Sequence, residues 1–237
     1  MQPIPGKKAA NITAEKLPDL IETKSGLKNN ARKLLERARE TSLATNKIEQ
    51  LEEQTRRVQE TGSLLQGKMK DLIGLYNQGE LEKAKAQGNI LYTQFPNNSI
   101  VPNILGAVYT GLGKYKDAII FYEKAIELRP DYSDAYNNLG TLYRKIKKYE
   151  EALVTYHKAI ELKPDYAEAY NNLGNVFNSL GRPKDALANY RKAIKIKLDY
   201  VEAYYGLGTA LSEMEKYEEA VKNYNKAIKL KKRDLKD

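Results

Sequence analysis

Apolar, small and polar residues follow a pattern that recurs every 34 residues in the C-terminal part of the chain. Ser133 to Tyr166 and Ala167 to Tyr200 align without a gap. Within each unit the aromatic, leucine, glycine and alanine positions lie three or four residues apart, which places them on one face of a helix. A period of this length is typical of a solenoid, in which each unit buries its apolar face by stacking on the next. The pattern therefore predicts an all-α chain of paired helices.

Glycine stands inside the helical pattern at the same place in four units. These residues are Gly106, Gly140, Gly174 and Gly208. Glycine in a helix interior costs about 1 kcal/mol relative to alanine, so we expect a neighbouring helix to need the space. Gly113 and Gly181 fall between the two helices of their units, where a helix C-cap is expected. Pro130 and Pro164 should end the second helices of their units.

The packing positions of one complete unit carry a resemblance to a known family. They are Tyr136, Leu139, Gly140, Tyr143, Ala152, Tyr156, Ala159 and Pro164. This set resembles the tetratricopeptide repeat (TPR) family, strongly over residues 99–231. Residues 65–98 resemble a degenerate repeat that lacks the Leu-Gly pair. The resemblance implies a right-handed superhelix of helix–turn–helix units, in which the first helix of each unit lines a concave groove.

These patterns predict a tail, a long helix and five repeats. The expected boundaries are a disordered tail at 1–24, a coiled-coil-like amphipathic helix at 25–63, a degenerate repeat at 64–98, repeats at 99–132, 133–166, 167–200 and 201–234, and a short tail at 235–237.

The resemblance places candidate binding residues on the groove face of each first helix. Asparagine is unfavourable inside a helix, so the pairs Asn137-Asn138 and Asn171-Asn172 at one phase suggest a use. A carboxamide both donates and accepts, so it can pair with the backbone of an extended peptide. Similar asparagine ladders line the groove of O-linked N-acetylglucosamine transferases. The alternative is that asparagines are simply common at these positions in the family and have no binding role. The candidate groove residues are Asn103, Asn137, Asn138, Thr141, Lys145, Asn171, Asn172, Asn175, Asn178 and Tyr205.

One known binding mode of the family is not expected here. TPR domains that hold the C-terminal carboxylates of heat-shock chaperones use Lys, Asn and Arg on three successive groove helices. In one register the matching places hold Asn103 and Ala107, then Asn138, then Glu168 and Asn172. In the next register they hold Asn137 and Thr141, then Asn172, then Glu202 and Gly206. Neither register supplies the cations that pair with a carboxylate.

A different pattern precedes the repeats. From Leu27 to Leu51 small, apolar and threonine residues step by four and three, continuing loosely to Leu65, as in a heptad with a thin core. Such a helix must dock on the first repeat, another copy or a partner coiled coil. Glu36–Leu65 also resembles part of a SNARE helix of the glutamine-bearing class, with Gln54 as the central polar layer, although Lys68 interrupts the pattern where another layer is due.

Composition narrows the classes of function. The net charge of +9 is spread along the chain, and the basic C-terminal residues complement a helix C-terminus; an acidic partner is the alternative. We therefore expect no nucleic-acid binding. There is no cysteine, no run of about 18 apolar residues and no signal-peptide core, so a cytoplasmic location without a membrane span is expected. No catalytic, metal-binding or cofactor-binding motif is found, and the single histidine, His157, is expected on the surface.

The sequence thus predicts a non-catalytic scaffold that binds a protein or peptide segment in its groove. One alternative is the targeting part of a larger enzyme of the glycosyltransferase or sulfotransferase type. Another is a SNARE-like tethering component that uses residues 27–65. A homodimer is a further hypothesis, through the N-terminal helix or through an uncapped last repeat. In that last repeat we expect partial exposure of Ala210, Leu211, Val221, Tyr224 and Ile228.

Overall fold

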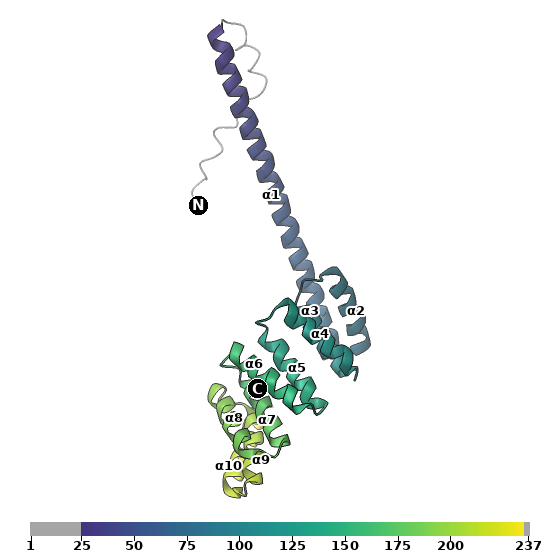
Figure 1. The fold of residues 1–237 in the computed structure, drawn as a ribbon, viewed down its shortest axis with the longest axis vertical. Helices are drawn as coiled ribbons and strands as arrows, with labels where there is room; N and C mark the ends of the chain where they lie inside the picture. The colour runs from purple at the N-terminus through teal and green to yellow at the C-terminus, as the bar shows by residue number, and fades with distance from the viewer. Residues whose placement is uncertain (1–24, 235–237) are drawn as a thin grey trace. The chain divides into compact units, whose positions relative to one another are not determined.

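Ten helices make up the part of the chain that the computed structural model describes, residues 25–234. The tails expected at 1–24 and 235–237 lie outside the described residues. The helices are α1 (Ser25–Asn77), α2 (Leu81–Gln94), α3 (Ile100–Gly111), α4 (Tyr115–Leu128), α5 (Ser133–Lys145), α6 (Tyr149–Leu162), α7 (Ala167–Ser179), α8 (Pro183–Ile196), α9 (Val201–Glu213) and α10 (Tyr217–Asp234) (Figure 1). The chain divides into two compact units, with the division between Leu64 and Leu65.

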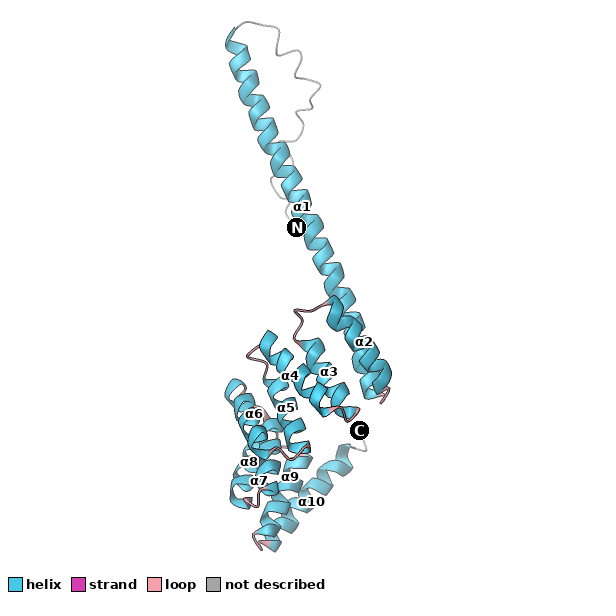
Figure 2. Cartoon of the chain, turned by 45° about the vertical axis from the view of Figure 1, so that its right-hand side comes forward, coloured by secondary structure: helices cyan, strands magenta, loops and turns pink. Residues whose placement is uncertain are grey.

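The second unit is a stack of helix pairs. From α2 to α10 each helix packs on the next one along the chain, and short loops join them (Figure 2). The first helices of successive pairs, α3, α5, α7 and α9, also contact one another. Since α3 contacts α5, α5 contacts α7, and α7 contacts α9, these four helices form one continuous layer. We call it the inner layer. The expected all-α solenoid of helix–turn–helix units is confirmed.

Glycine allows the two helices of a pair to approach closely. A Cβ atom at Gly174 would lie 2.7 Å from the ring of Tyr190, and one at Gly140 would lie 2.8 Å from the ring of Tyr156. These distances are shorter than real Cβ contacts, so no larger side chain fits without a shift. The tyrosine rings are at most 1% exposed. The predicted role of the in-helix glycines, to leave room for a neighbouring helix, is therefore confirmed.

The turns between paired helices share one backbone conformation. Gly79, Gly113 and Gly181 have φ of 76°, 72° and 67°, the left-handed region that glycine adopts at little cost. Lys147 and Glu215 stand at the same place in their repeats and also have a positive φ, 61° in both. The sequence identified Gly113 and Gly181 as caps but gave no sign of the two charged residues.

The last repeat is better covered than expected. Ala210 and Leu211 are at most 1% exposed, because α10 packs along α9. The prediction of exposure is wrong for these two residues. It holds for Val221 and Ile228, whose exposed fractions are 55% and 52%. Tyr217 continues this apolar stripe on α10 and is also exposed.

Helix α1 runs through the boundary expected at residues 63 and 64 without a break. In the second unit its last turns carry Leu72, which is fully buried in a core with Ala84 and Leu91 of α2. In the first unit Leu43, Ile48 and Leu64 are more than half exposed. Docking of this segment on a coiled-coil partner stays a prediction. None of the helices in the described region combines the length and apolar character that crossing a membrane requires.

Candidate functional site

The candidate residues all lie on α3, α5, α7 and α9, the helices of the inner layer. Because residues 34 positions apart are equivalent, they form rows that cross these helices. One row consists of the paired amides, a second contains Thr141, Asn175 and Thr209, and a third contains Thr110, Arg144, Asn178 and Ser212. The rows differ in how far their polar atoms are paired.

The paired asparagines form a ladder between repeats. Asn138 donates from Nδ2 to Oδ1 of Asn103 at 3.1 Å, and Asn172 donates in the same way to Asn137 at 3.1 Å. Asn103 also donates to the hydroxyl of Tyr132 at 3.3 Å. The ladder therefore connects α3 to α5 and α5 to α7 through directional polar contacts.

The first asparagine of each pair is interior. Asn103, Asn137 and Asn171 are 8%, 7% and 5% exposed. The prediction that these three side chains are presented to the groove is corrected here, because the approach of the inner-layer helices encloses them. Buried amides need hydrogen-bond partners, and the second asparagine of the next repeat supplies one. Asn138 and Asn172 are half-buried and hold this link.

The ladder ends at α9. The residue that would donate to Asn171 is Gly206, and the ring of Tyr190 fills the space beside it: a Cβ atom there would lie 2.5 Å from the ring. Oδ1 of Asn171 is consequently buried without a hydrogen-bond partner among the described residues. The neighbouring candidate Tyr205 replaces the first asparagine of its pair, is 63% exposed and lies 5.4 Å from the ring of Tyr224.

The second row supports the packing tyrosines. The hydroxyl of Tyr190 donates to Oδ1 of Asn175 at 2.7 Å, and Tyr224 donates to Thr209 at 3.3 Å. The hydroxyls of Thr141 and Tyr156 lie 3.1 Å apart. Burial raises the pKa of Tyr156, while the Thr141 hydroxyl and the Arg144 guanidinium lower it. The row thus gives polar partners to the hydroxyls of Tyr156, Tyr190 and Tyr224.

The third row contains two buried polar atoms without a partner. Nε of Arg144 and Oδ1 of Asn178 have no hydrogen-bond partner in the described part of the chain. The candidate Lys145, next to Arg144, is exposed, and its amino group lies 5.6 Å from the ring centre of Tyr115 on α4. Sequence reasoning missed Arg144, although its place one period before the candidate Asn178 was a signal.

The opposite ends of the inner-layer helices carry an acidic edge. Asp134, Glu168 and Glu202 are exposed in the first turns of α5, α7 and α9, where carboxylates are favourable near a helix N-terminus. Burial, and then Glu168 and Glu202, raise the pKa of Tyr200 to about 12. This edge was also missed, although its members recur at the 34-residue period.

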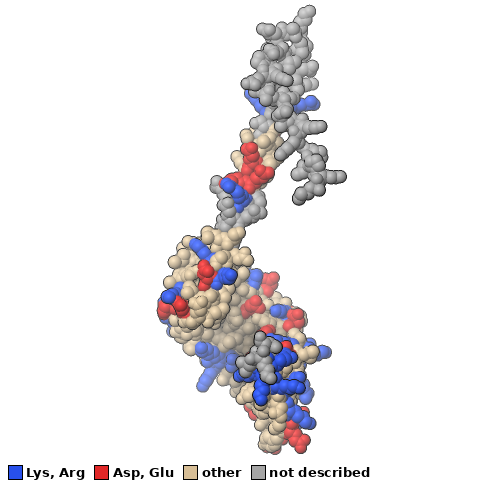
Figure 3. All heavy atoms as spheres, turned by 180° about the vertical axis from the view of Figure 1, so that it is seen from behind, with Lys and Arg blue, Asp and Glu red and all other residues tan. Residues whose placement is uncertain are grey.

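The remaining charges are mixed over the surface. On the face drawn in Figure 3, basic side chains gather toward the C-terminal repeats, with acidic side chains among them. Of the basic C-terminal residues, Lys229, Lys231 and Lys232 are exposed. His157 is exposed on α6, as expected.

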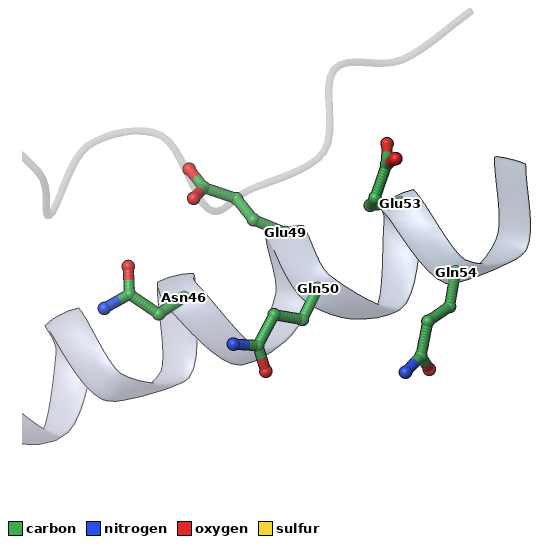
Figure 4. Close-up of a pocket in the computed structure, with 5 residues that line it drawn as sticks. All are labelled: Asn46, Glu49, Gln50, Glu53 and Gln54. Atoms are coloured by element: carbon green, nitrogen blue, oxygen red, sulfur yellow. The ribbon is translucent and has the colours of Figure 1, made fainter. Parts of the chain in front are cut away.

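A shallow depression also lies on α1, within the first unit. It is lined by Asn46, Glu49, Gln50, Glu53 and Gln54. Figure 4 shows that all five side chains come from one helix and fan out from it. Gln54, the central residue of the SNARE-like pattern, is exposed there. Because a single helix forms the whole depression, it does not enclose a ligand, and the candidate site is placed on the inner layer instead.

Comparison with known proteins identifies the repeats. Sequence models described as TPR repeat match residues 140–181 and 174–214, and models described as tetratricopeptide repeat match residues 103–132, 121–154 and 201–234. No curated protein matches the chain.

Among solved structures, the chain is similar to MamA, with 30% sequence identity and a TM-score of 0.60, over 69% of this chain and 96% of MamA. It is similar to YrrB, described as a TPR protein with an unusual peptide-binding site, with 25% identity and a TM-score of 0.53, over 67% of this chain and 82% of YrrB. PilF of Pseudomonas aeruginosa shares the fold, with 21% identity and a TM-score of 0.65, over 70% of this chain and 75% of PilF. The repeat matches and the likeness to MamA together show that the chain belongs to the tetratricopeptide repeat family.

Proposed function

We propose that this protein is a scaffold that binds an extended segment of a partner protein along the inner layer formed by α3, α5, α7 and α9. Membership of a repeat family whose matched structures include a protein with a peptide-binding site supports this function. The binding surface would be the rows of polar side chains that cross the four helices.

One observation carries the proposal. Half-buried polar side chains recur at the 34-residue period on two neighbouring helices of the inner layer: Asn138, Thr141 and Arg144 on α5, and Asn172, Asn175 and Asn178 on α7. A side-chain amide both donates and accepts hydrogen bonds. A peptide backbone, which offers an N–H and a C=O at each residue, can pair with the accessible parts of these side chains.

Peptide selection on the full chain tests the proposal. Four helices about 9 Å apart span a length that about ten extended residues cover, so a displayed library of random peptides of that length is selected on the immobilised protein. We expect enriched peptides to bind in solution, as followed by fluorescence anisotropy. Asn178→Ala should weaken them several-fold, because it removes one of the half-buried amides of this surface.

Asn189→Ala is the matched control. Asn189 lies on α8, outside the inner layer, and donates to the carbonyl of Asp185 on its own helix. It should leave peptide affinity unchanged. A selection that enriches no peptide would overturn the proposal, and equal losses in both variants would place binding outside the inner layer.

A further inference from the structure

The charge of the outer surface changes along the stack. We call the second helices of the pairs, α4, α6, α8 and α10, the outer helices. In α4 and α6 acidic residues outnumber lysine and arginine by three to two and by three to one. In α8 four basic residues accompany one acidic residue, and in α10 six accompany three. Because α7 and α9 contain acidic residues and no basic ones, each of the last two repeats pairs an acidic inner helix with a basic outer helix.

A lysine on each of the earlier outer helices has an acidic partner one turn later. Lys124 of α4 pairs with Glu127 at 2.8 Å, and Lys158 of α6 pairs with Glu161 at 2.7 Å. Residues three positions apart are neighbours on the surface of a helix. The two charges of each pair therefore largely cancel toward solvent.

At the same places α8 and α10 have two lysines each. Lys192 and Lys226 correspond to the paired lysines, and Lys195 and Lys229 stand where the glutamates would be. All four are exposed, and the ion pairs within the described part of the chain include none of them. Like charges one turn apart are slightly unfavourable in a helix. The last two repeats thus hold a cluster of cations that earlier repeats neutralise, and we call these four lysines the basic surface.

Tyrosine rings of the inner layer lie near two of these amino groups without neutralising them. Nζ of Lys192 and Nζ of Lys226 lie 5.9 Å from the ring centres of Tyr170 and Tyr204. A cation beside an aromatic face keeps its charge, and at an exposed site the attraction is weak. The positive charge of the basic surface is therefore available to a partner.

Exposed apolar side chains accompany the cations on α10. Tyr217, Val221 and Ile228 are each more than half exposed, and Lys232, one turn after Ile228, lies beside them on the helix surface. A helix that presents both lysines and apolar side chains is typical of adsorption to a membrane surface, where the apolar groups enter the interface and the amino groups reach lipid phosphates. A polynucleotide backbone offers partners to the lysines but none to the aliphatic side chains.

We propose that the outer surface of α8 and α10 adsorbs to a membrane that contains anionic phospholipid. The basic surface contacts the headgroups, and the apolar side chains of α10 enter the interface. Each lysine near such a membrane increases the bound fraction about fivefold, so four lysines together account for a gain on the order of several hundredfold. The acidic residues Glu168 and Glu202 of the inner layer are repelled by the same membrane, which favours the orientation with the outer helices toward it. This inference is independent of the proposed function, because it concerns the other layer of the repeats.

Sedimentation of the full chain with lipid vesicles tests the proposal. Vesicles of phosphatidylcholine alone are compared with vesicles in which about one third of the lipid is phosphatidylglycerol. We expect the protein to sediment with the anionic vesicles and to stay in solution with the neutral ones. Raising the salt from about 0.1 M towards 1 M should release most of the bound protein, because the range of the attraction falls from about 10 Å to 3 Å.

The double variant Lys195→Glu, Lys229→Glu restores the acidic residue that the earlier repeats have. New pairs of the Lys124–Glu127 kind can then form, so the fold should be retained, as circular dichroism verifies. We expect adsorption to the anionic vesicles to fall at least tenfold. Glu161→Lys, which extends the basic surface to α6, should strengthen adsorption several-fold.

The double variant Lys114→Glu, Lys116→Glu is the matched control. It changes the net charge by the same amount at two exposed positions at the start of α4, outside the basic surface, and should alter adsorption less than twofold. An equal loss in both double variants would overturn the proposal, because net charge and not this surface would then determine binding. Failure of the wild type to adsorb to anionic vesicles would also overturn it, whether the chain binds double-stranded DNA instead or pairs with a second copy through α10.

Discussion

Lys147 and Glu215 adopt the backbone conformation that the equivalent residues Gly79, Gly113 and Gly181 adopt in other repeats. A side chain with a Cβ atom is strained in this left-handed region by about 1–2 kcal/mol. The turn after α5 and the turn after α9 therefore carry a local cost that the other turns avoid. The sequence does not predict this strain, because the 34-residue period gives the position of a turn and not the φ of its residues.

We expect Lys147→Gly to stabilise the protein by about 0.5–1 kcal/mol, since relief of the strain exceeds the extra entropy that glycine has in the unfolded chain. Urea unfolding followed by circular dichroism measures this. Gly113→Ala places a Cβ atom at the equivalent position and should destabilise the protein by a similar amount. A loss of stability in Lys147→Gly would show that the lysine side chain matters more than its backbone strain.

The buried tyrosines predict a loss of stability at alkaline pH. Burial and two carboxylates raise the pKa of Tyr200 to about 12, above the value of about 10 for an exposed tyrosine. Above pH 10 the unfolded state therefore binds fewer protons than the folded state, so stability falls as the pH rises towards 12. Absorbance at about 295 nm should show that part of the tyrosine population ionises only together with the loss of helical signal. Ionisation of all tyrosines near pH 10 with the helices intact would contradict this.

At the scale of the helices, the amide ladder links each repeat to the next. The sequence showed the asparagines at a constant phase but not their burial, because a one-dimensional period does not reveal how closely alternate helices approach. Packing positions were easier to predict. A glycine inside a helix, such as Gly174, lowers helix stability, and the close approach of a neighbouring helix explains why it is there. The structure gives the reason why the ladder stops at Gly206: the ring of Tyr190 occupies the space that a side chain would need there.

Asn172→Ala should lower the free energy of unfolding by about 1–3 kcal/mol, because it leaves Oδ1 of Asn137 buried without a partner. Thermal or urea unfolding measures the change. Asn178→Ala removes an amide that has no internal partner for its Oδ1 and should cost less. Equal stability of wild type and Asn172→Ala would mean that water replaces the lost donor and that the ladder contributes little.

At the scale of the whole molecule, the two units differ in how their apolar residues are covered. In the second unit the repeats bury most of their apolar residues against neighbours, and one of the exposed groups lies along α10. There Val221 and Ile228 correspond to Leu187 and Ile194 of α8, which are packed in the core beside α9. The sequence-based hypothesis of pairing through the last repeat therefore concerns a face that other repeats cover.

This hypothesis predicts that the purified chain shows a concentration-dependent mass above that of a monomer in light scattering at micromolar concentration. The double variant Val221→Lys, Ile228→Lys should reduce the mass to that of a monomer, because like charges would meet in a self-complementary contact. Its melting temperature should change little, since both side chains are about half exposed. A monomeric wild type at these concentrations would contradict pairing through α10.

The end of the amide ladder has a mechanical consequence. Between α3 and α5, and between α5 and α7, amide hydrogen bonds resist sliding and rotation because their energy depends on direction. Between α7 and α9 the corresponding place holds the ring of Tyr190 against Gly206, an apolar contact without such directional preference. Of the three joints between inner-layer helices, we therefore expect the one between α7 and α9 to bend at the lowest cost.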